Sequence, residues 1–350
     1  MHQAMEKIFR RHSQTYRHDY QLDWQVLDAD MTGRPCGKKA RFASKGYFAK
    51  QRNRRGRQAG YVIGTWYEEI VVERLFDGKT QLNCALQPLL QAAEQVLELD
   101  ERKRQRTIVR IDSGGGSVGE LNWLLGRAYQ LHGKDYSGVR AKALAESVRE
   151  WIADPADSSR QMGWVTVPAE LYCRPVQRIA VRCRKKNGQW GYGVIISTLA
   201  PKEVLLLTGG YEQEVNDPKA VLLAYVNFYD QRGGSVEIEI KEDKQGLGTS
   251  KRNKKRFEAQ QLLIQLEALA HNLLVWARQW LKPLCPKLAP LGIKRLVRDA
   301  FQIDGFLIFD QALTLLQIHL NRANPLAKQL APGLAALLAF EQVAVSLGET

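Results

Sequence analysis

The first third of the chain contains short runs with the character of β-strands. In residues 24–30 apolar and polar positions alternate, the pattern of a strand that buries one face. Further runs predict strands at residues 61–66, 70–75 and 107–112. The first run ends on Asp30 and the fourth, which is β-branched, ends on Asp112. Turn residues follow both aspartates, so both carboxylates are expected where a strand ends.

Helical patterns separate these strands. Apolar residues recur at helical spacing over residues 84–99, which predicts an amphipathic helix. A capping box at Ser117–Glu120 opens a second helix, expected to reach about His132, and residues 136–142 are expected to add a fifth strand. This order places the first and fourth strands side by side in a mixed α/β sheet.

The remaining pattern changes twice along the chain. Over residues 164–207, short runs of alternating apolar and polar positions predict a β-rich insertion. It includes a hairpin over residues 179–196 around Lys186-Asn187-Gly188. Asp217-Pro218 then starts a helix, and leucine spacing predicts a long helix over residues 257–281. Between these helices, residues 236–244 alternate like a strand by periodicity alone. Beyond Pro283 the chain is leucine-rich, which predicts a helical region.

Composition limits the class of protein. A chain of 350 residues with 45% hydrophobic residues is a folded protein of about two domains, not a disordered or fibrous one. Its 51 Lys and Arg against 37 Asp and Glu give a net charge of +14, which points to a polyanionic partner. The 5 cysteines form no CxxC pair, as expected of reduced thiols in the cytoplasm. No apolar run is long enough to span a membrane.

The basic residues concentrate in one stretch. From Asp30 the next acidic residue is Glu68, and the interval is rich in Lys and Arg. A solvated surface is one explanation of such a run. Its position directly after a strand-borne aspartate favours contact with phosphates instead. The expected phosphate contacts are Arg52, Arg54, Arg55 and Arg57.

Carboxylates at the ends of two adjacent strands, joined by a third from a later helix, suit hard divalent cations. Two such ions, about 4 Å apart, can activate the attacking oxygen and stabilise the leaving oxygen of a phosphodiester. A single strand-end aspartate is more often a turn residue, so the argument depends on Asp30 and Asp112 acting together. Asp28 is either a supporting carboxylate or a structural partner.

Three motifs resemble those of the DDE transposases of bacterial insertion sequences. Leu27–Gly33 is similar to the first-aspartate motif, whose spacing to a following Thr selects Asp30. Arg110–Gly114 is similar to the second and selects Asp112. The third motif, a series of Tyr, Arg, Glu and Lys around the last carboxylate, is matched by Tyr229, Arg232, Glu237 and Lys244. The resemblance extends over about residues 24–281.

This resemblance implies a ribonuclease-H-like catalytic core in which Asp30, Asp112 and Glu237 hold two Mg²⁺ ions, with Mn²⁺ as a substitute. It implies a transposase that hydrolyses double-stranded DNA at the ends of a mobile element and transfers the released 3′-hydroxyl to a second phosphodiester. It also favours a helix over residues 236–244. The residues then expected to contact DNA near the cut are Tyr229, Arg232, Lys241 and Lys244.

The implied fold is an α/β, ribonuclease-H-like mixed sheet with a β-rich insertion and a helical C-terminal region. Its expected segments are an N-terminal arm (1–22), the first part of the catalytic core (23–142), the β-rich insertion (143–215), the closing helices of the core (216–281) and the helical C-terminal region (282–350). Family members commonly carry a helical DNA-binding domain before the first strand. We therefore expect this chain alone to bind DNA with weak sequence specificity. The expected location is the bacterial cytoplasm, with the protein at the nucleoid when it is bound to DNA.

Several alternatives stay open. A transposase-derived DNA-binding protein without catalysis, and a nuclease without strand transfer, share the same basic surface and carboxylates. Four residues separate Arg232 from Glu237, where the family usually has three. His132 and His271, on predicted helices, are expected to be packed rather than catalytic. The C-terminal leucines fit either a homodimer or burial within one chain.

Overall fold

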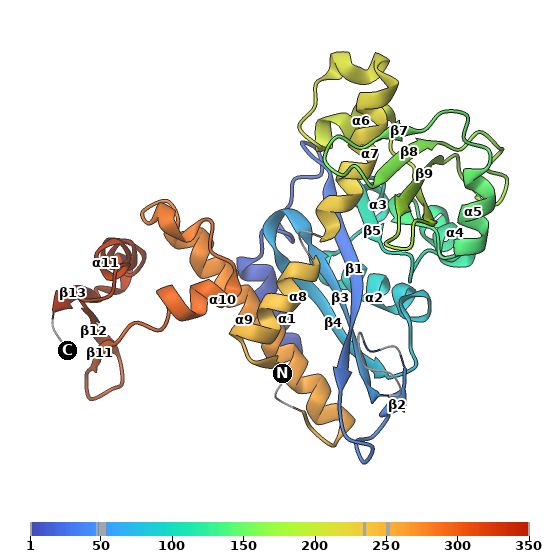
Figure 1. The fold of residues 1–350 in the computed structure, drawn as a ribbon. Helices are drawn as coiled ribbons and strands as arrows, with labels where there is room; N and C mark the ends of the chain where they lie inside the picture. The colour runs from blue at the N-terminus through green and yellow to red at the C-terminus, as the bar shows by residue number, and fades with distance from the viewer. Residues whose placement is uncertain (1, 47, 49–53, 234–235, 250–252, 349–350) are drawn as a thin grey trace. The chain divides into compact units, whose positions relative to one another are not determined.

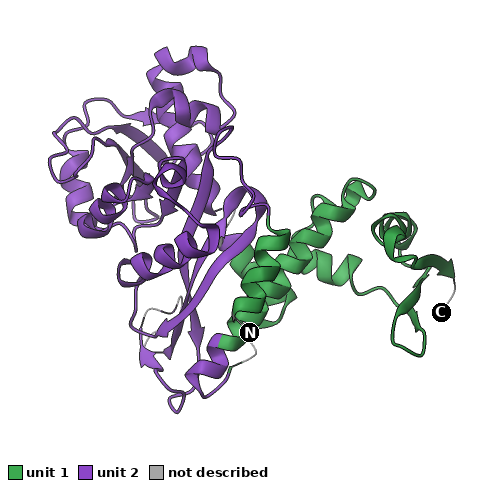
Figure 2. Cartoon of the chain, turned by 180° about the vertical axis from the view of Figure 1, so that it is seen from behind, with its two compact units in different colours: residues 1–13, 239–253, 262–350 green, residues 14–238, 254–261 purple. Residues whose placement is uncertain are grey.

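The computed structural model describes residues 2–46, 48, 54–233, 236–249 and 253–348. The chain forms two compact units, which are described separately (Figures 1 and 2). The core unit consists of residues 14–238 and 254–261, and the second unit of residues 1–13, 239–253 and 262–350.

One mixed sheet of ten strands organises the core unit. Its strands run in the order β2-β3-β1-β5-β6-β10-β9-β8-β7, and β4 also pairs with β3. The first and fourth predicted strands, now β1 and β5, are neighbours as expected, and they pair in parallel. The strands are β1 (Gln25–Pro35), β2 (Ser44–Lys45), β3 (Arg55–Gly64), β4 (Glu69–Asp77), β5 (Thr107–Ile111), β6 (Gln130–Lys134), β7 (Ile152–Ala153), β8 (Arg160–Trp164), β9 (Gln177–Arg184) and β10 (Trp190–Ser197).

The β-rich insertion does not form a separate sheet. Its predicted hairpin is confirmed as β9 and β10, and β10 pairs antiparallel with β6, so the insertion extends the main sheet. Two predictions beside it are wrong. The helix after Ser117 ends at Gly126 and His132 lies on β6, while residues 138–145 are helical rather than a strand. Each apolar run was too short to distinguish a buried strand from a helix.

Helices cover this sheet and connect the two units. The helix predicted over residues 84–99 is present as Leu82–Leu97, and the predicted helices after Asp217 and over residues 257–281 are confirmed. Residues 236–246 are helical, as the resemblance implies and against their strand-like periodicity. The helices are α1 (His2–His12), α2 (Leu82–Leu97), α3 (Glu101–Gln105), α4 (Val118–Gly126), α5 (Gly138–Ala145), α6 (Pro201–Leu207), α7 (Pro218–Gly233), α8 (Val236–Gly246), α9 (Phe257–Leu281), α10 (Ile293–Arg295) and α11 (Ala327–Leu337).

Helix α7 is the one that matters most for the candidate site. Its buried residues Val221, Tyr225 and Phe228 pack in one core with Val26 of β1 and Ile108 of β5. The burial of this apolar face holds the C-terminal end of α7 beside the middle of β1, where Arg232 contacts Ala29 and Asp30.

The second unit corrects the prediction of a wholly helical C-terminal region. Besides α11 it contains a three-stranded sheet with the order β11-β12-β13, formed by β11 (Gly305–Phe309), β12 (Leu315–Asn321) and β13 (Ala344–Gly348). This region is rich in leucine and its apolar and polar positions alternate only weakly, so the sequence pattern did not indicate these strands. His271 is buried on α9 and contacts Asp243 at 2.8 Å, as expected of a packed histidine. In the described part of the chain, no helix is both long and apolar enough to cross a membrane.

Candidate active site

The pairing of β1 with β5 brings the two strand-borne aspartates to the same level. Ala29 is the partner of Ile111 in this parallel ladder, so Asp30 and Asp112 are the next residues on their respective chains. β5 ends at Ile111, so Asp112 follows a strand end as expected. β1 continues to Pro35 along β3, so the prediction that Asp30 ends its strand is wrong. Residues at one level of a parallel pair project from the same face of the sheet, so the Asp30 and Asp112 carboxyls are on the same face.

A tight glycine turn fixes the Asp112 side chain. The Gly114 amide donates a hydrogen bond of 2.8 Å to Asp112 Oδ1. Glycine is required at position 116, because a Cβ atom there would lie 1.8 Å from the carbonyl oxygen of Lys134. The turn therefore passes close to β6 and holds the carboxylate directly after β5.

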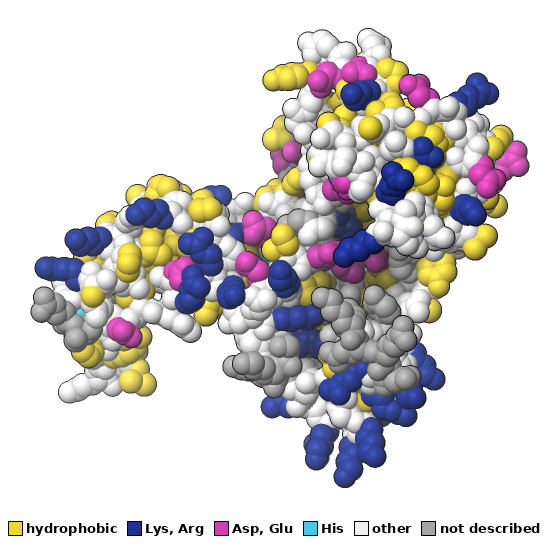
Figure 3. Space-filling view, in the orientation of Figure 1, with side chains coloured by type: hydrophobic (Ala, Val, Ile, Leu, Met, Phe, Trp, Pro, Cys, Tyr) yellow, Lys and Arg dark blue, Asp and Glu magenta, His cyan; other side chains and the backbone are white. Residues whose placement is uncertain are grey.

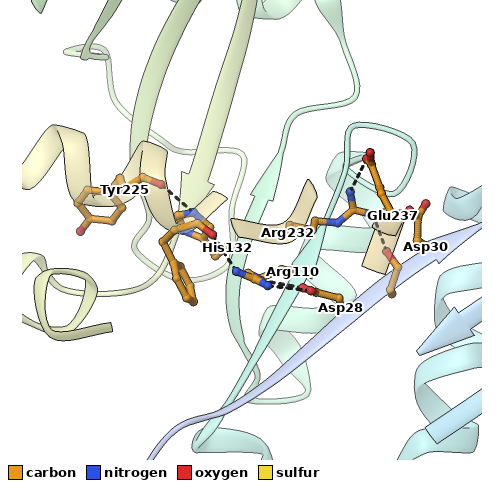
Figure 4. Close-up of polar contacts among 9 residues, drawn as sticks. Asp28, Asp30, Arg110, His132, Tyr225, Arg232 and Glu237 are labelled. Carbon is orange, nitrogen blue, oxygen red and sulfur yellow. Dashed lines mark hydrogen bonds and ion pairs between the residues drawn. The ribbon is translucent and has the colours of Figure 1, made fainter. Parts of the chain in front are cut away.

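Arg232 joins the carboxylates of the site. Its Nη2 atom lies 3.1 Å from Asp30 Oδ2, and its Nη1 atom lies 3.7 Å from Glu237 Oε1 at the start of α8 (Figure 4). It also donates a hydrogen bond to the carbonyl oxygen of Ala29. The Arg232 side chain is 3% exposed, compared with 16% for Asp30 and 62% for Glu237, so only the glutamate is open to solvent.

Electrostatic coupling shows that Asp112 belongs to the same cluster. Burial raises the pKa of Asp30 from 3.8 to about 6; Arg232 opposes this increase, while Asp112 and Glu237 add to it. Burial also raises the pKa of Tyr229 to about 12, with further increases from Asp112 and Glu237. The site thus concentrates negative charge around one buried guanidinium.

A buried polar network beneath the site anchors α7. Arg110 of β5 forms two hydrogen bonds of 2.7 Å with the Asp28 carboxylate and donates another of 2.8 Å to the carbonyl oxygen of Phe228. His132 of β6 contacts the carbonyl oxygen of Tyr225 at 3.1 Å. The sequence left two roles open for Asp28. Its ion pair with Arg110 shows that it is a structural partner.

His132 is packed, as expected, although it lies on a strand. Burial and the charge of Arg110 lower its pKa to about 3, so the imidazole is neutral at ordinary pH. Sequence analysis missed the anchoring role of Arg110. A charged residue inside a β-branched strand, two positions before Asp112, was a usable signal, because such a charge must find a partner.

The carboxylates of the site are ligands of the type that a divalent metal ion takes, but their arrangement in this structure does not form a metal site. Carboxylate oxygens are what Mg²⁺ prefers. Yet no group of three His, Cys, Asp or Glu residues among those described is placed to hold an ion together. The guanidinium of Arg232 lies against Asp30 and Glu237, where it neutralises them.

The predicted phosphate contacts fall into three groups. Arg54 and Arg55 are exposed, and Arg52 lies outside the described residues. Arg57 corrects the prediction: it is 1% exposed and donates to the carbonyl oxygens of Arg41, Lys254 and Lys255, so it cannot reach DNA. It instead joins the basic stretch to a second basic segment, residues 254–256.

Together these segments form a basic surface at the end of the core unit near β2, where Lys and Arg side chains gather (Figure 3). Its exposed residues are Lys38, Lys39, Arg41, Lys45, Arg54, Arg55, Lys254, Lys255 and Arg256. Arg41 is paired with Glu258 at 2.9 Å. Lys241 is exposed and Lys244 half-buried; both follow Glu237 on α8 at spacings that share one helix face.

Comparisons with known proteins identify no family. No family model matches the sequence, and no curated protein matches it. A solved structure of piggyBac transposase in a synaptic complex with hairpin DNA aligns with a TM-score of 0.49 and 12% sequence identity. The alignment covers 85% of this chain and 58% of that one, so this chain spans less than two thirds of the length of the solved protein. A similarity at this level assigns no activity.

The raised pKa of Asp30 makes a testable prediction about stability. Between about pH 4 and 6 the folded state holds this proton more tightly than the unfolded state, so stability falls as pH rises through that range. A shift from 3.8 to about 6 corresponds to about 3 kcal/mol. In urea unfolding, the difference between wild type and Asp30→Asn should change by that amount between pH 4 and 7. A difference that does not vary with pH would contradict it.

Proposed function

We propose that this chain is a DDE-type enzyme that cleaves DNA phosphodiesters with the help of divalent metal ions, and that it acts as a transposase. The observation that carries the proposal is that Asp30 and Glu237, far apart in sequence, both pair with Arg232, while Asp112 follows β5 at the level of Asp30 on the neighbouring strand. Each of them also occupies a matching position in one of the three sequence motifs.

The strand order supports a ribonuclease-H-like core. Strands β1, β3 and β4 form an antiparallel set, and β5 and β6 add in parallel on the other side of β1. This arrangement, with carboxylates on β1 and directly after β5 and a third on a later helix, is the one that the motif resemblance implies. The insertion lies between β6 and α7, before the third carboxylate.

The proposed division of roles follows from burial and charge. Asp30, Asp112 and Glu237 would hold Mg²⁺, which when bound supplies charge to activate and stabilise phosphodiester oxygens. Arg232 keeps Asp30 and Glu237 close together in the absence of other cations. A buried guanidinium with a raised pKa is also a permanent positive charge for a phosphate at the sheet edge. Tyr229, which burial keeps protonated, is available as a hydrogen-bond donor.

The basic surface provides the DNA contacts in this proposal. Its exposed lysines and arginines come from two segments that Arg57 joins, so they form one continuous site for a phosphate backbone. Lys241 and Lys244 are proposed to contact DNA near the cut, because they follow Glu237 on the same helix.

One observation favours a second candidate, a DNA-binding protein without catalysis. Arg232 is ion-paired with two of the three carboxylates, and the described residues contain no ready-made group of three metal ligands. In that case the basic surface would bind DNA while the carboxylates served only to balance Arg232.

Cleavage of supercoiled plasmid separates the two candidates. The enzyme should nick or linearise plasmid with Mg²⁺ or Mn²⁺, whereas Ca²⁺, which is larger and less exacting in geometry, should support binding with little cleavage. Excess chelator is the matched control and should abolish cleavage. Plasmid binding without cleavage under every metal condition would support the second candidate and contradict the first.

A further inference from the structure

A cavity of about 470 Å³ lies in the core unit, where the β-rich insertion meets β6 and α5. Its volume is within the range of ligand pockets, about 300–1,000 Å³. The lining comes from the end of β6, from α5 and from the hairpin of β9 and β10. Every charged residue of this lining is a lysine, namely Lys134, Lys142 and Lys185. A cavity lined by cations and by no carboxylate suits an anion.

The charges of these three lysines are free for a ligand. Lys134 is half-buried at the end of β6, whereas Lys142 and Lys185 are exposed. Within the described chain, their ammonium groups form no ion pair. The neighbouring carboxylate, Asp135, is paired with Arg140 at 2.5 Å. The lining therefore holds positive charge that the described part of the protein does not balance.

Two glycines of β10 give the lysine side chains their places. A Cβ atom on Gly193 would lie 2.4 Å from Cε of Lys134, and a Cβ atom on Gly191 would lie 3.0 Å from Cε of Lys185. Both lysine stems thus lie over strand positions that lack a side chain. Glycine inside a strand weakens it and often marks a place where a ligand or another chain approaches closely.

The edge of β10 adds backbone donors to the cavity. The Asp135 amide donates a hydrogen bond of 2.9 Å to the carbonyl oxygen of Val194, so the backbone groups of Val194 face β6. This direction alternates along an antiparallel strand, so the N–H groups of Trp190 and Tyr192 face the same edge. Both residues line the cavity, beyond the point where β6 ends at Lys134. Lysines and backbone N–H groups together are common donors to phosphate.

The aromatic side chains of this hairpin do not offer the cavity a stacking surface. Side chains alternate along a strand, so the Trp190 and Tyr192 rings project from the face opposite to Gly191 and Gly193. The Trp190 ring is also covered by Arg182, whose guanidinium lies 4.6 Å from its centroid. Charge and hydrogen-bond donors without a free aromatic face favour phosphate groups over nucleobases as the ligand.

The cavity lies on the α7 side of the sheet, next to the candidate active site. Nζ of Lys134 lies 5.8 Å from the centroid of the Tyr229 ring. Cys183, which also lines the cavity, is the ladder partner of Arg160. Nη1 of Arg160 lies 2.5 Å from Oδ2 of Asp230. Tyr229 and Asp230 are in the last turn of α7 with Arg232, which pairs with the site carboxylates.

We propose that this cavity binds two or more linked phosphates of one DNA strand that continues from the candidate active site into the β-rich insertion. The inference rests on the proposed function for the identity of the strand. The cavity is larger than one phosphate requires, which favours linked phosphates. A free polyphosphate would meet the same donors, but Lys134 faces both the cavity and Tyr229, and this continuity favours a strand that reaches the site.

Protection of Cys183 from alkylation measures occupancy of the cavity directly. The thiol is exposed, and Cys173 is an exposed thiol outside the lining that serves as an internal control. A saturating single-stranded oligodeoxythymidylate, without divalent metal, should slow the reaction of Cys183 with iodoacetamide by at least about fivefold. The rate at Cys173 should not change, and peptide mass spectrometry follows both sites. An unprotected Cys183 would overturn the proposal.

Inorganic tripolyphosphate distinguishes a strand from a free polyphosphate. At equal concentrations of phosphate groups, the oligonucleotide should protect Cys183 at a concentration at least about tenfold lower, because a strand is also held outside the cavity. The reverse order would overturn the assignment to a DNA strand.

The salt dependence of oligonucleotide affinity tests the lysines. Lys142→Gln combined with Lys185→Gln should reduce the slope of log affinity against log salt by about 1.4, because each contact to a single strand contributes about 0.7. The matched control is Lys186→Gln combined with Lys219→Gln, which removes two exposed lysines outside the lining and should leave the slope near that of wild type. Equal slopes for the two double variants would contradict the proposed contacts.

These measurements separate failure of the cavity from failure of the proposed function, because none of them needs metal or cleavage. A wild type that cleaves plasmid but shows no protection of Cys183 overturns the cavity assignment and leaves the proposed enzyme intact. Protection of Cys183 in a chain that does not cleave supports the cavity assignment together with the second candidate function.

Discussion

Replacing Asp30 or Asp112 by Asn, or Glu237 by Gln, should each reduce plasmid cleavage about a thousandfold or more. The three carboxylates act on one cluster of charge, as the effect of Asp112 and Glu237 on the pKa of Asp30 shows. Residues that act as a unit have non-additive effects, so a double variant should be little worse than the single ones. The initial rate of nicking measures the effect, and fluorescence anisotropy of a labelled duplex should show DNA affinity near that of wild type.

The matched control is Asp157→Asn, which removes the same charge from an exposed turn between β7 and β8. It should cleave like wild type. If Glu237→Gln retains substantial cleavage while Glu239→Gln is inactive, the third carboxylate has been assigned to the wrong residue. If all three site variants cleave normally, the carboxylate cluster is not an active site.

Replacing Arg110 by Met should destabilise the core unit by about 3–5 kcal/mol. The substitution removes both hydrogen bonds that Arg110 donates to the Asp28 carboxylate at a position that is 0% exposed, and breaking a buried ion pair is costly. It also removes the hydrogen bond to Phe228, which helps to hold α7 and therefore Arg232 in place. Urea unfolding followed by tryptophan fluorescence measures the loss.

Two comparisons identify its cause. Lys202→Met breaks an ion pair whose side chains are 53% and 62% exposed, and should change stability by no more than about 0.5 kcal/mol. Asp28→Leu combined with Arg110→Met removes both charges and should be less destabilising than Arg110→Met alone. A double variant as unstable as the sum of the two single ones would show that packing, not charge, explains the loss.

The sequence predicted elements well where a local pattern was long or bounded by clear signals. The helix over residues 257–281 was predicted with the bounds that the structure has, because its leucines recur over many turns. That β1 and β5 are neighbours was also predicted from the order of the elements, whereas their parallel direction was not. Short runs failed, as at His132, where a helix was expected and a buried strand is present.

By itself the sequence determined the residue types of the candidate site and the strands that carry Asp30 or precede Asp112, since these depend on spacing along the chain. Only the tertiary structure decided which charges meet. Arg57 and Arg54 look equivalent in sequence, yet one is buried against backbone carbonyls and the other is exposed. Likewise, Arg232 reaches Asp30 because α7 packs on the sheet. Burial and ion pairing join residues distant in sequence, and no local periodicity records which of them pack together.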